Sequence, residues 1–274
     1  MNMKILAPAA MMAAALQASA AVPAYDTLIS HRGESIDAPE NTLPAYKTAV
    51  ERGFGFECDI YLSSDNRLFT FHDKNLARTT GGANTNACTA VDWETTVSKL
   101  NVGGWGKWKG SKFDPTRPAL LEEVLALARP GRKIYVEVKG DNPEWVPHIK
   151  KVFAKEPKAT PDTVLFIAFG EKVSAELKRQ MPEFKTFWLT AREYDADRLV
   201  AKLRKLGVDG VDICFNRKKM TRELVAKVRA AGFELHVWTV DNLNGAIEAF
   251  KRGAMTVTTN CAKKLLDGYE AGKK

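Results

Sequence analysis

The chain has 274 residues, of which 45% are hydrophobic and 27% charged, and a formal net charge of +8 at pH 7. This length is ample for one large core, and a positive surface favours anionic partners in general. The Lys and Arg residues are scattered along the chain. Because no basic block with interleaved aromatic residues occurs, we expect no nucleic acid partner.

The first twenty residues have the features of an export signal. Lys4 supplies a positive charge, Ile5–Leu16 an apolar run and Ala18–Ala20 an A-x-A cleavage site. The apolar run is shorter than the roughly 20 residues of a membrane-spanning helix, so we expect no transmembrane anchor. We therefore expect removal of residues 1–20 and export of the mature protein, residues 21–274, to the periplasm or out of the cell.

Runs rich in Val, Ile and Phe alternate with helical patterns along the rest of the chain. Apolar residues recur at three- and four-residue spacing in each helical stretch. We predict strands at Thr27–Ser30, Gly55–Ile60, Ile134–Lys139, Val164–Phe169, Thr186–Leu189, Gly210–Ile213, Leu235–Val240 and Thr256–Thr259. The helices are predicted to begin near Thr42, Leu120, Glu144, Glu171, Asp195, Thr221, Asn242 and Ala262. This alternation favours a single TIM (β/α)₈ barrel domain over an open doubly wound sheet.

One additional strand interrupts the alternation. The run Leu68–His72 follows the second strand after a turn at 64–66 that is too short for a parallel crossover, so we predict an antiparallel hairpin. Pairing around a centre between Asp65 and Asn66 would place Asp59 opposite His72. The hairpin would thereby return His72 to the acidic residues of the second strand.

Three acidic residues lie near the ends of neighbouring predicted strands. Glu57 and Asp59 point to one face of a strand, and Glu137 and Lys139 repeat this spacing in the next barrel strand. Converging carboxylates repel one another unless a positive charge lies between them, which a Ca²⁺ or Mg²⁺ ion would supply. We therefore predict Glu57, Asp59 and Glu137 as metal ligands. The alternative is a buried salt-bridge network with Lys139 and Arg32, which would still leave excess negative charge.

Two histidines directly follow apolar strand runs beside these acids. Imidazole titrates near neutral pH, so His31 and His72 suit the roles of general acid and general base. Arg32 offers planar donors for a phosphate, and Lys139 adds a positive charge. His148 and His236 are predicted to be structural, and the pairing of the four cysteines stays open.

The most economical use of this set is cleavage of a phosphodiester. Cations would hold the non-bridging oxygens while one imidazole activates the attacking oxygen and the other protonates the leaving alkoxide. No G-x-S-x-G elbow or Walker A loop occurs, which sets aside acyl transfer and P-loop nucleotide hydrolysis. Aromatic residues near strand ends, Phe169, Trp188, Phe215 and Trp238, could line the pocket for the alcohol half of the substrate, and Trp238 is the best candidate.

Several motifs together resemble the glycerophosphodiester phosphodiesterase family. They are HRG at 31–33, PENT at 39–42, ExD at 57–59, HDxxLxRTT at 72–80, VEVK at 136–139 and WTVD at 238–241. The resemblance spans nearly the whole mature chain. It implies a TIM barrel that uses Ca²⁺ or Mg²⁺ to hydrolyse glycerophosphodiesters to glycerol 3-phosphate and an alcohol, often through a cyclic phosphate. By position it implies the same roles for His31, His72, Glu57, Asp59, Glu137, Arg32 and Lys139.

Two segments depart from the family pattern. The last strand ends at 258–261 as Thr-Thr-Asn-Cys, without the Pro that commonly follows in relatives, and we expect this difference to affect barrel closure more than chemistry. Residues 81–118, rich in Gly, Asn and Trp, form an irregular insertion. Because long inserts are usually binding loops or lids, we predict that this one covers the barrel mouth and sets the size of the alcohol leaving group.

Three other functions stay open from the sequence. A phospholipase D-like enzyme acting on intact lipids would be favoured by an apolar rim on the insert. A glycosidase would leave Arg32 and Lys139 unexplained, and a non-catalytic phosphodiester-binding protein ought to have lost a histidine or an acid. The preferred alcohol, the choice between Ca²⁺ and Mg²⁺ and the oligomeric state are not determined by the sequence.

Overall fold

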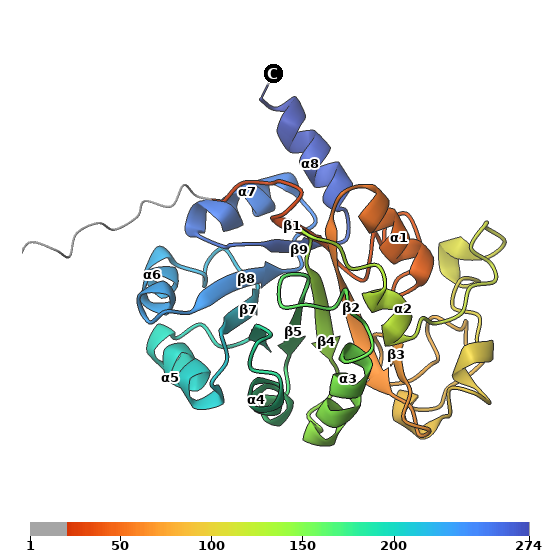
Figure 1. Ribbon diagram of the computed structural model, residues 1–274. Coiled ribbons are helices and arrows are strands. Elements are labelled where there is room, and N and C mark those ends of the chain that lie inside the picture. The colour runs from red at the N-terminus through yellow and green to blue at the C-terminus, as the bar shows by residue number, and fades with distance from the viewer. Residues whose placement is uncertain (1–20, 274) are drawn as a thin grey trace, which may run out of the picture.

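Nearly every strand residue of this protein is buried, as in a parallel sheet covered on both faces. The computed structural model describes residues 21–273 and shows eight parallel strands closed into a barrel (Figure 1). These strands are β1 (Leu28–Ser30), β2 (Gly55–Leu62), β4 (Ile134–Val138), β5 (Val164–Ala168), β6 (Thr186–Thr190), β7 (Gly210–Cys214), β8 (Glu234–Trp238) and β9 (Val257–Thr259). Pairing of β1 with both β2 and β9 closes the barrel, which confirms the predicted fold.

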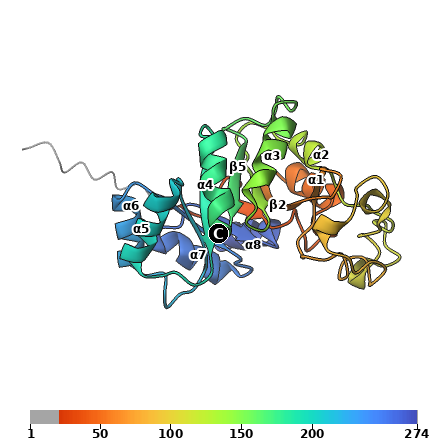
Figure 2. The same cartoon turned by 90° about the horizontal axis from the view of Figure 1, so that it is seen from below.

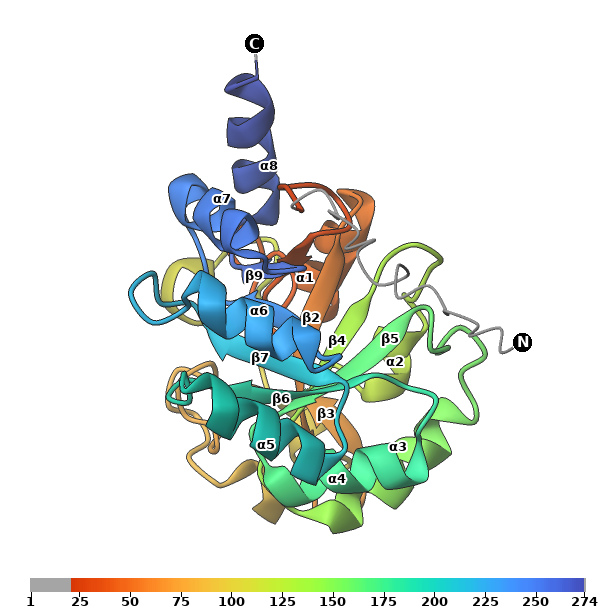
Figure 3. The same cartoon turned by 90° about the vertical axis from the view of Figure 1, so that its left-hand side faces the viewer.

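Helices cover the outside of the barrel and pack their apolar stripes on the strands (Figures 1 and 3). They are α1 (Leu43–Glu51), α2 (Leu121–Leu125), α3 (Val146–Phe153), α4 (Glu171–Gln180), α5 (Ala196–Leu206), α6 (Arg222–Ala230), α7 (Leu243–Arg252) and α8 (Ala262–Ala271). Helix α5 shows how individual residues set the two ends of a helix. The Asp195 side chain caps its first turn, and Gly207, with φ of 70°, ends it in the left-handed conformation that glycine adopts readily.

The predicted hairpin is present, but its register differs by one residue from the prediction. Strand β3 (Leu68–Thr70) pairs antiparallel with β2, and Ile60 lies opposite Thr70. The turn closes from Ser63 to Arg67, so the pairing is centred on Asp65, and Asn66 in this loop takes a left-handed conformation with φ of 63°. The predicted pairing of Asp59 with His72 is therefore wrong, since the Asp59 carbonyl accepts from the amide of Phe71.

The insert, residues 81–118, lies at the side of the barrel beside β3 and α2, away from α5 and α6 (Figure 2). Its regular structure is limited to the short turns η1 (Cys88–Ala90), η2 (Val97–Lys99) and η3 (Gly106–Trp108). It follows β3, which pairs with β2 at the end of the sheet order and with the segment around Leu120, and which does not belong to the closed barrel. This departure point directs the insert to the flank of the barrel.

A small apolar cluster fills the barrel interior and forms the floor under the carboxyl ends of the strands. Its buried members are Ile29, Tyr135, Leu165, Ile167, Phe187 and Leu189. Because this floor excludes water, polar side chains one layer above it lie in an environment of low dielectric. The predicted site residues belong to that upper layer.

The predicted export signal, residues 1–20, lies outside the described residues. Within residues 21–273, no helix combines the length and the apolar character that crossing a bilayer would require.

Gly33 provides a test of how tightly the first turn after β1 is packed. It has φ of 80°, and a Cβ placed there would lie 2.6 Å from the backbone carbon of Ala45. We expect Gly33→Ala to lower the free energy of unfolding by about 2–5 kcal/mol in urea titrations, through both backbone strain and overlap. The control is Gly82→Ala, where φ is 85° but no atom lies within 4 Å, and where strain alone should cost about 1–2 kcal/mol. If both variants lost the same free energy of unfolding, overlap with Ala45 would not contribute to the effect of Gly33→Ala.

Candidate active site

The HRG motif forms a tight turn at the carboxyl end of β1. Arg32 and Gly33 both have positive φ, of 55° and 80°, which is rare for a side chain as large as Arg. This conformation points the backbone amide of Arg32 at Glu57, whose Oε2 accepts it at 2.8 Å. Backbone strain of this kind clusters at functional sites, where surrounding contacts hold it in place.

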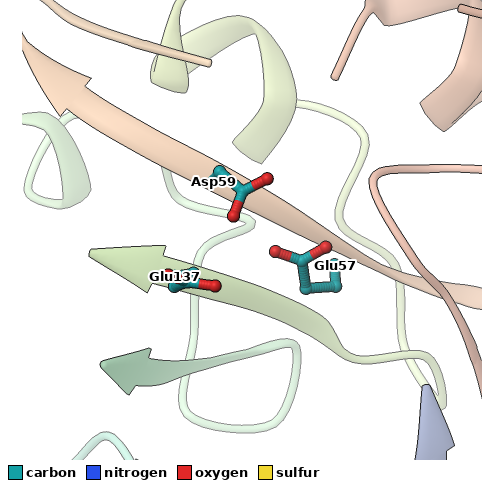
Figure 4. A group of neighbouring side chains, drawn as sticks. All are labelled: Glu57, Asp59 and Glu137. Carbon is teal, nitrogen blue, oxygen red and sulfur yellow. The ribbon is translucent and has the colours of Figure 1, made fainter. Parts of the chain in front are cut away.

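The three predicted metal ligands lie together. Glu57 and Asp59 on β2 and Glu137 on β4 each offer a carboxylate oxygen within 4.8 Å of the others, and all three are buried (Figure 4). The pairing of Asp59 with Glu137 in the β2–β4 register brings them side by side. Lys139 lies in the same cluster, with Nζ 2.7 Å from Asp59 Oδ1 and 2.7 Å from Glu137 Oε1.

The pKa values of these three acids indicate that the cluster holds more negative charge than its two bases offset. Burial, together with the charges of Asp59 and Glu137, raises the pKa of Glu57 well above its usual value. Burial and the charge of Asp59 raise the pKa of Glu137 to about 7. Burial acts on Asp59 too, but Lys139 and Arg32 hold its pKa well below the usual range. Lys139 and Arg32 therefore stabilise the charged form of Asp59, whereas the negative charges of Glu57 and Glu137 are not fully compensated.

The donor set fits a hard divalent cation. Three carboxylates of the kind that Ca²⁺ and Mg²⁺ prefer converge within ligand distance of one another. Glu57 Oε1 is buried and has no hydrogen-bond partner within the described part of the chain, so one ligand oxygen is oriented without a donor. The salt-bridge alternative is thus present only in part, because Lys139 and Arg32 leave Glu57 Oε1 unpaired.

Asn41, in the PENT motif, positions Asp59 and was assigned no role from sequence. Its Nδ2 donates to Asp59 Oδ2 at 2.7 Å, and its Oδ1 accepts from the Asp59 amide at 3.1 Å and from Tyr46 at 2.8 Å. Like Arg32, Asn41 has positive φ, of 54°. The PENT motif was the only sign of this residue in the sequence. The contact of Asn41 with Asp59 forms because the loop that carries the motif folds against β2.

His31 is oriented by a chain of two polar residues, Asn260 directly after β9 and Asp241 in the loop after β8. Its Nδ1 lies 2.7 Å from Asn260 Oδ1, while Asn260 Nδ2 donates to Asp241 Oδ2 at 2.6 Å. Asp241 fixes the amide orientation, so Asn260 Oδ1 accepts a hydrogen bond from His31 Nδ1–H. This leaves Nε2 as the basic nitrogen, 4.0 Å from Glu57. The expectation that residues 258–261 affect closure more than chemistry is wrong, because Asn260 contacts a candidate catalytic side chain.

His72 has a charged partner instead. Its Nδ1 lies 2.7 Å from Asp73 Oδ1, and Arg78 binds both Asp73 and Glu40. Glu40 also accepts from Arg32 at 2.9 Å, which links the loops of both histidines. Burial lowers the pKa of His72, and Asp73 opposes that effect.

The site residues surround a cavity of about 220 Å³ at the carboxyl ends of the strands, called here the inner cavity. A second, more open cavity of about 870 Å³, the outer cavity, adjoins it. His72, Glu137, Lys139 and Phe169 line both, whereas His31 and Arg32 line only the inner one. The predicted site residues are thus brought together, and His72 lies at the boundary between the two cavities.

The aromatic candidates divide into two groups. Trp238 lines the inner cavity and packs edge-to-face on Phe169 with ring centroids 5.6 Å apart. Trp188 and Phe215 instead pack against the core between barrel and helices. Trp238 therefore lines the inner cavity, and its contact with the alcohol half of a substrate stays a prediction.

The insert does not cover the mouth of the barrel. Among the described residues that line the two cavities, none belongs to 81–118. Lys107 donates to the carbonyl of Ile36 at 2.6 Å, and Trp105 lies under the Arg78 guanidinium, 5.1 Å from the ring centroid. The predicted lid is wrong, because the insert leaves from the edge strand β3 and braces the loops that carry Arg32 and His72 from outside.

Comparison with known proteins decides the family. Residues 31–263 match the model of the glycerophosphoryl diester phosphodiesterase family. The chain belongs to this family. It is accordingly a phosphoric diester hydrolase on a TIM barrel.

Individual family members are distant in sequence and similar in length. Glycerophosphodiester phosphodiesterases of Bacillus subtilis and Caldanaerobacter subterraneus are each 27% identical, over 85% and 89% of this chain and 82% and 98% of their own. The fold is similar to that of an Oleispira antarctica phosphodiesterase solved with the product sn-glycerol-3-phosphate, with a TM-score of 0.78 and 24% identity over 89% of this chain and 96% of that chain.

The contact between Asn260 and His31 predicts a specific change in titration. Burial and the charge of Arg32 lower the pKa of His31 to about 4, while the hydrogen bond to Asn260 raises it. We expect Asn260→Ala to lower the His31 pKa further, as measured by NMR of the imidazole C–H resonances. The His72 resonance is the internal control, because its ring is held by Asp73. An unchanged or raised His31 pKa would remove Asn260 from this role.

Proposed function

We propose that this hydrolase cleaves glycerophosphodiesters to glycerol 3-phosphate and an alcohol, using a divalent cation and two histidines. The observation that carries the proposal is the arrangement around the inner cavity, where His31, Arg32, Glu57, His72, Glu137 and Lys139 share one wall. The family, and relatives named as glycerophosphodiester phosphodiesterases, support the substrate class. The product bound to the Oleispira antarctica enzyme is the one that this reaction would release.

The partners of the two histidines suggest which is the base and which the acid. His31 Nδ1 donates to a neutral amide and burial keeps the ring uncharged, so its Nε2 is free to take a proton from the attacking oxygen. His72 is held by the carboxylate of Asp73, which stabilises a positively charged ring. Its position at the boundary of the two cavities suits an acid that protonates the departing alkoxide.

Glu57, Asp59 and Glu137 would hold the cation. When bound, a divalent cation neutralises charge on the phosphate oxygens. Both Ca²⁺ and Mg²⁺ bind carboxylates, so these three ligands fit either ion. Arg32 and Lys139 line the same cavity and would bind the phosphate oxygens. Although burial lowers it, the charges of Asp59 and Glu137 raise the pKa of Lys139, which therefore stays charged.

The other functions considered from sequence have less support. Membership of a phosphodiesterase family does not favour a glycosidase, and both histidines and all three acids are present and converge. For the described residues, the large exposed apolar side chains are Val22, Tyr25, Ile36, Phe169 and Met255. None lies in the insert, so the apolar rim that would favour intact lipids as substrates is not found there.

The direct test is release of glycerol 3-phosphate from a panel of diesters that carry choline, ethanolamine, glycerol or inositol. We expect the reaction to depend on added Ca²⁺ or Mg²⁺ and to stop with chelator. His31→Ala and His72→Ala should each lower kcat by about 10²- to 10⁴-fold, because proton transfer contributes that much to such reactions.

The matched control for these variants is His148→Ala, since His148 lies on α3 and lines neither cavity. Its kcat should equal that of the parent protein. Hydrolysis of no diester in the panel would contradict the proposed function. Full activity in either site variant would remove that histidine from the mechanism.

The raised pKa values of Glu57 and Glu137 predict how cation binding depends on pH. Glu137 holds a proton below about pH 7, and Glu57, whose pKa is also raised, must likewise be deprotonated to bind a cation, so affinity should fall as pH is lowered from 8 to 6. Calorimetry should show about a tenfold loss per pH unit for each proton displaced. Glu137→Gln should weaken binding and flatten this dependence, whereas Glu144→Gln, on the exposed turn η4 (Pro143–Trp145), should change neither. A pH-independent affinity would contradict the predicted ligand set.

A further inference from the structure

Asp212, in the middle of β7, is a buried acid that the proposed chemistry does not use. Its side chain lines the inner cavity and is only 1% exposed. Neither carboxyl oxygen has a hydrogen-bond partner among residues 21–273. The acids of the candidate metal cluster differ, since Glu57 accepts from the Arg32 amide and Glu137 contacts Lys139.

The carboxyl group is therefore not explained by the packing of the barrel. Burying a carboxyl group without a partner destabilises a fold, and unsatisfied groups of this kind are rare in the absence of a function. The neighbouring Trp238 donates its indole N–H to the main-chain carbonyl of Asp212, at 3.1 Å, and so does not satisfy the side chain. Both carboxyl oxygens are thus buried without a partner among the described residues, in a side chain that lines the cavity.

The position of Asp212 defines a second half of the inner cavity. Leu189 lies beside it in the β6–β7 register, and Ile167 and Trp238 complete a largely apolar wall formed by β5, β6 and β8. The cations and the metal cluster lie on the other wall, formed by β1, β2 and β4. A substrate whose phosphate lies against that wall would extend its neighbouring carbon atoms toward Asp212.

We propose that Asp212 recognises the free hydroxyl groups of the glycerol half of the substrate. The glycerol phosphate would then occupy the inner cavity, and the alcohol leaving group would extend past His72 into the open outer cavity. This inference rests on the proposed function and adds to it the orientation of the substrate.

Hydroxyl groups are the fitting partners for chemical reasons. Two oxygens of one carboxyl group match the two hydroxyls of a vicinal diol, and the apolar wall suits the carbon atoms between them. Burial and the charge of Glu137 raise the pKa of Asp212 well above the usual value, which limits its repulsion of a phosphate. A hydroxyl can both donate to and accept from a carboxyl group, so recognition is possible in either protonation state.

The test pairs a substrate truncation with a residue truncation. Dissociation constants of sn-glycerol 3-phosphate and of 2-hydroxyethyl phosphate, which lacks the terminal hydroxymethyl group, are measured by calorimetry in buffer with a divalent cation. The parent protein should prefer glycerol 3-phosphate by about 10- to 100-fold, because the truncated ligand has one hydroxyl and leaves one oxygen of the buried carboxyl unpaired. Asp212→Val should abolish this preference, and Asp212→Asn should keep part of it.

Two controls separate recognition from structure. His148→Ala, which changes a residue that lines neither cavity, should keep the preference. The Tm of Asp212→Val should equal or exceed that of the parent protein, because an unpaired buried carboxyl is removed. A structural role for Asp212 would lower the Tm instead.

The outcomes distinguish this inference from the proposed function. If the parent protein hydrolyses glycerophosphodiesters but Asp212→Val keeps the parent's preference between the two ligands, the inference is overturned and the function stands. A parent protein without preference overturns the inference as well. If it hydrolyses no glycerophosphodiester, the proposed function fails, and the inference that rests on it fails too.

Discussion

The burial of three carboxylates between β2 and β4 is the constraint on which the rest of this site depends. Glu57, Asp59 and Glu137 lie where water cannot screen them, and the repulsion among them must be offset by groups that the fold brings in. Lys139 from β4 and the Arg32 turn from β1 supply part of the charge. The remaining deficit makes the cluster suited to a divalent cation.

The loops around the barrel mouth hold polar side chains in fixed orientations by networks of charged hydrogen bonds. Glu40 joins Arg32 to Arg78, and Arg78 joins Glu40 to Asp73 behind His72. The insert supports this network from outside through Trp105, which explains how a segment remote from the cavity can still be part of the active enzyme. Precise placement matters here, since proton transfer depends on hydrogen-bond distances.

The candidate catalytic residues lie on one wall of the inner cavity, and the residue proposed to recognise the substrate lies on the other. The ends of β1, β2 and β4 and the loop after β3 carry the acids, bases and histidines, whereas β5 to β8 contribute apolar side chains and Asp212, whose carboxyl has no partner among the described residues. A TIM barrel permits this division because each strand end contributes its residue independently of the others. Specificity can then change on one wall without disturbing the catalytic groups on the other.

The sequence by itself determined the order of the strands, the barrel and most of the catalytic wall. Glu57, Asp59 and Glu137 could be placed together because a two-residue spacing fixes the face of a strand and consecutive barrel strands are neighbours. His31 and Arg32 followed from their position at a strand end. These are local relations, which the chain carries wherever it folds.

Only the tertiary structure decided the contacts between segments far apart in the chain. Asn260 reaches His31 across 229 positions because β9 closes the barrel against β1, and no spacing in the sequence encodes that meeting. The hairpin register was set by a turn that closes from Ser63 to Arg67, and the insert followed the edge strand to the flank of the barrel. No motif or spacing in the sequence assigned a role to Asp212. Its significance arose from barrel closure, which buried its carboxyl in the cavity and gave it no partner among the described residues.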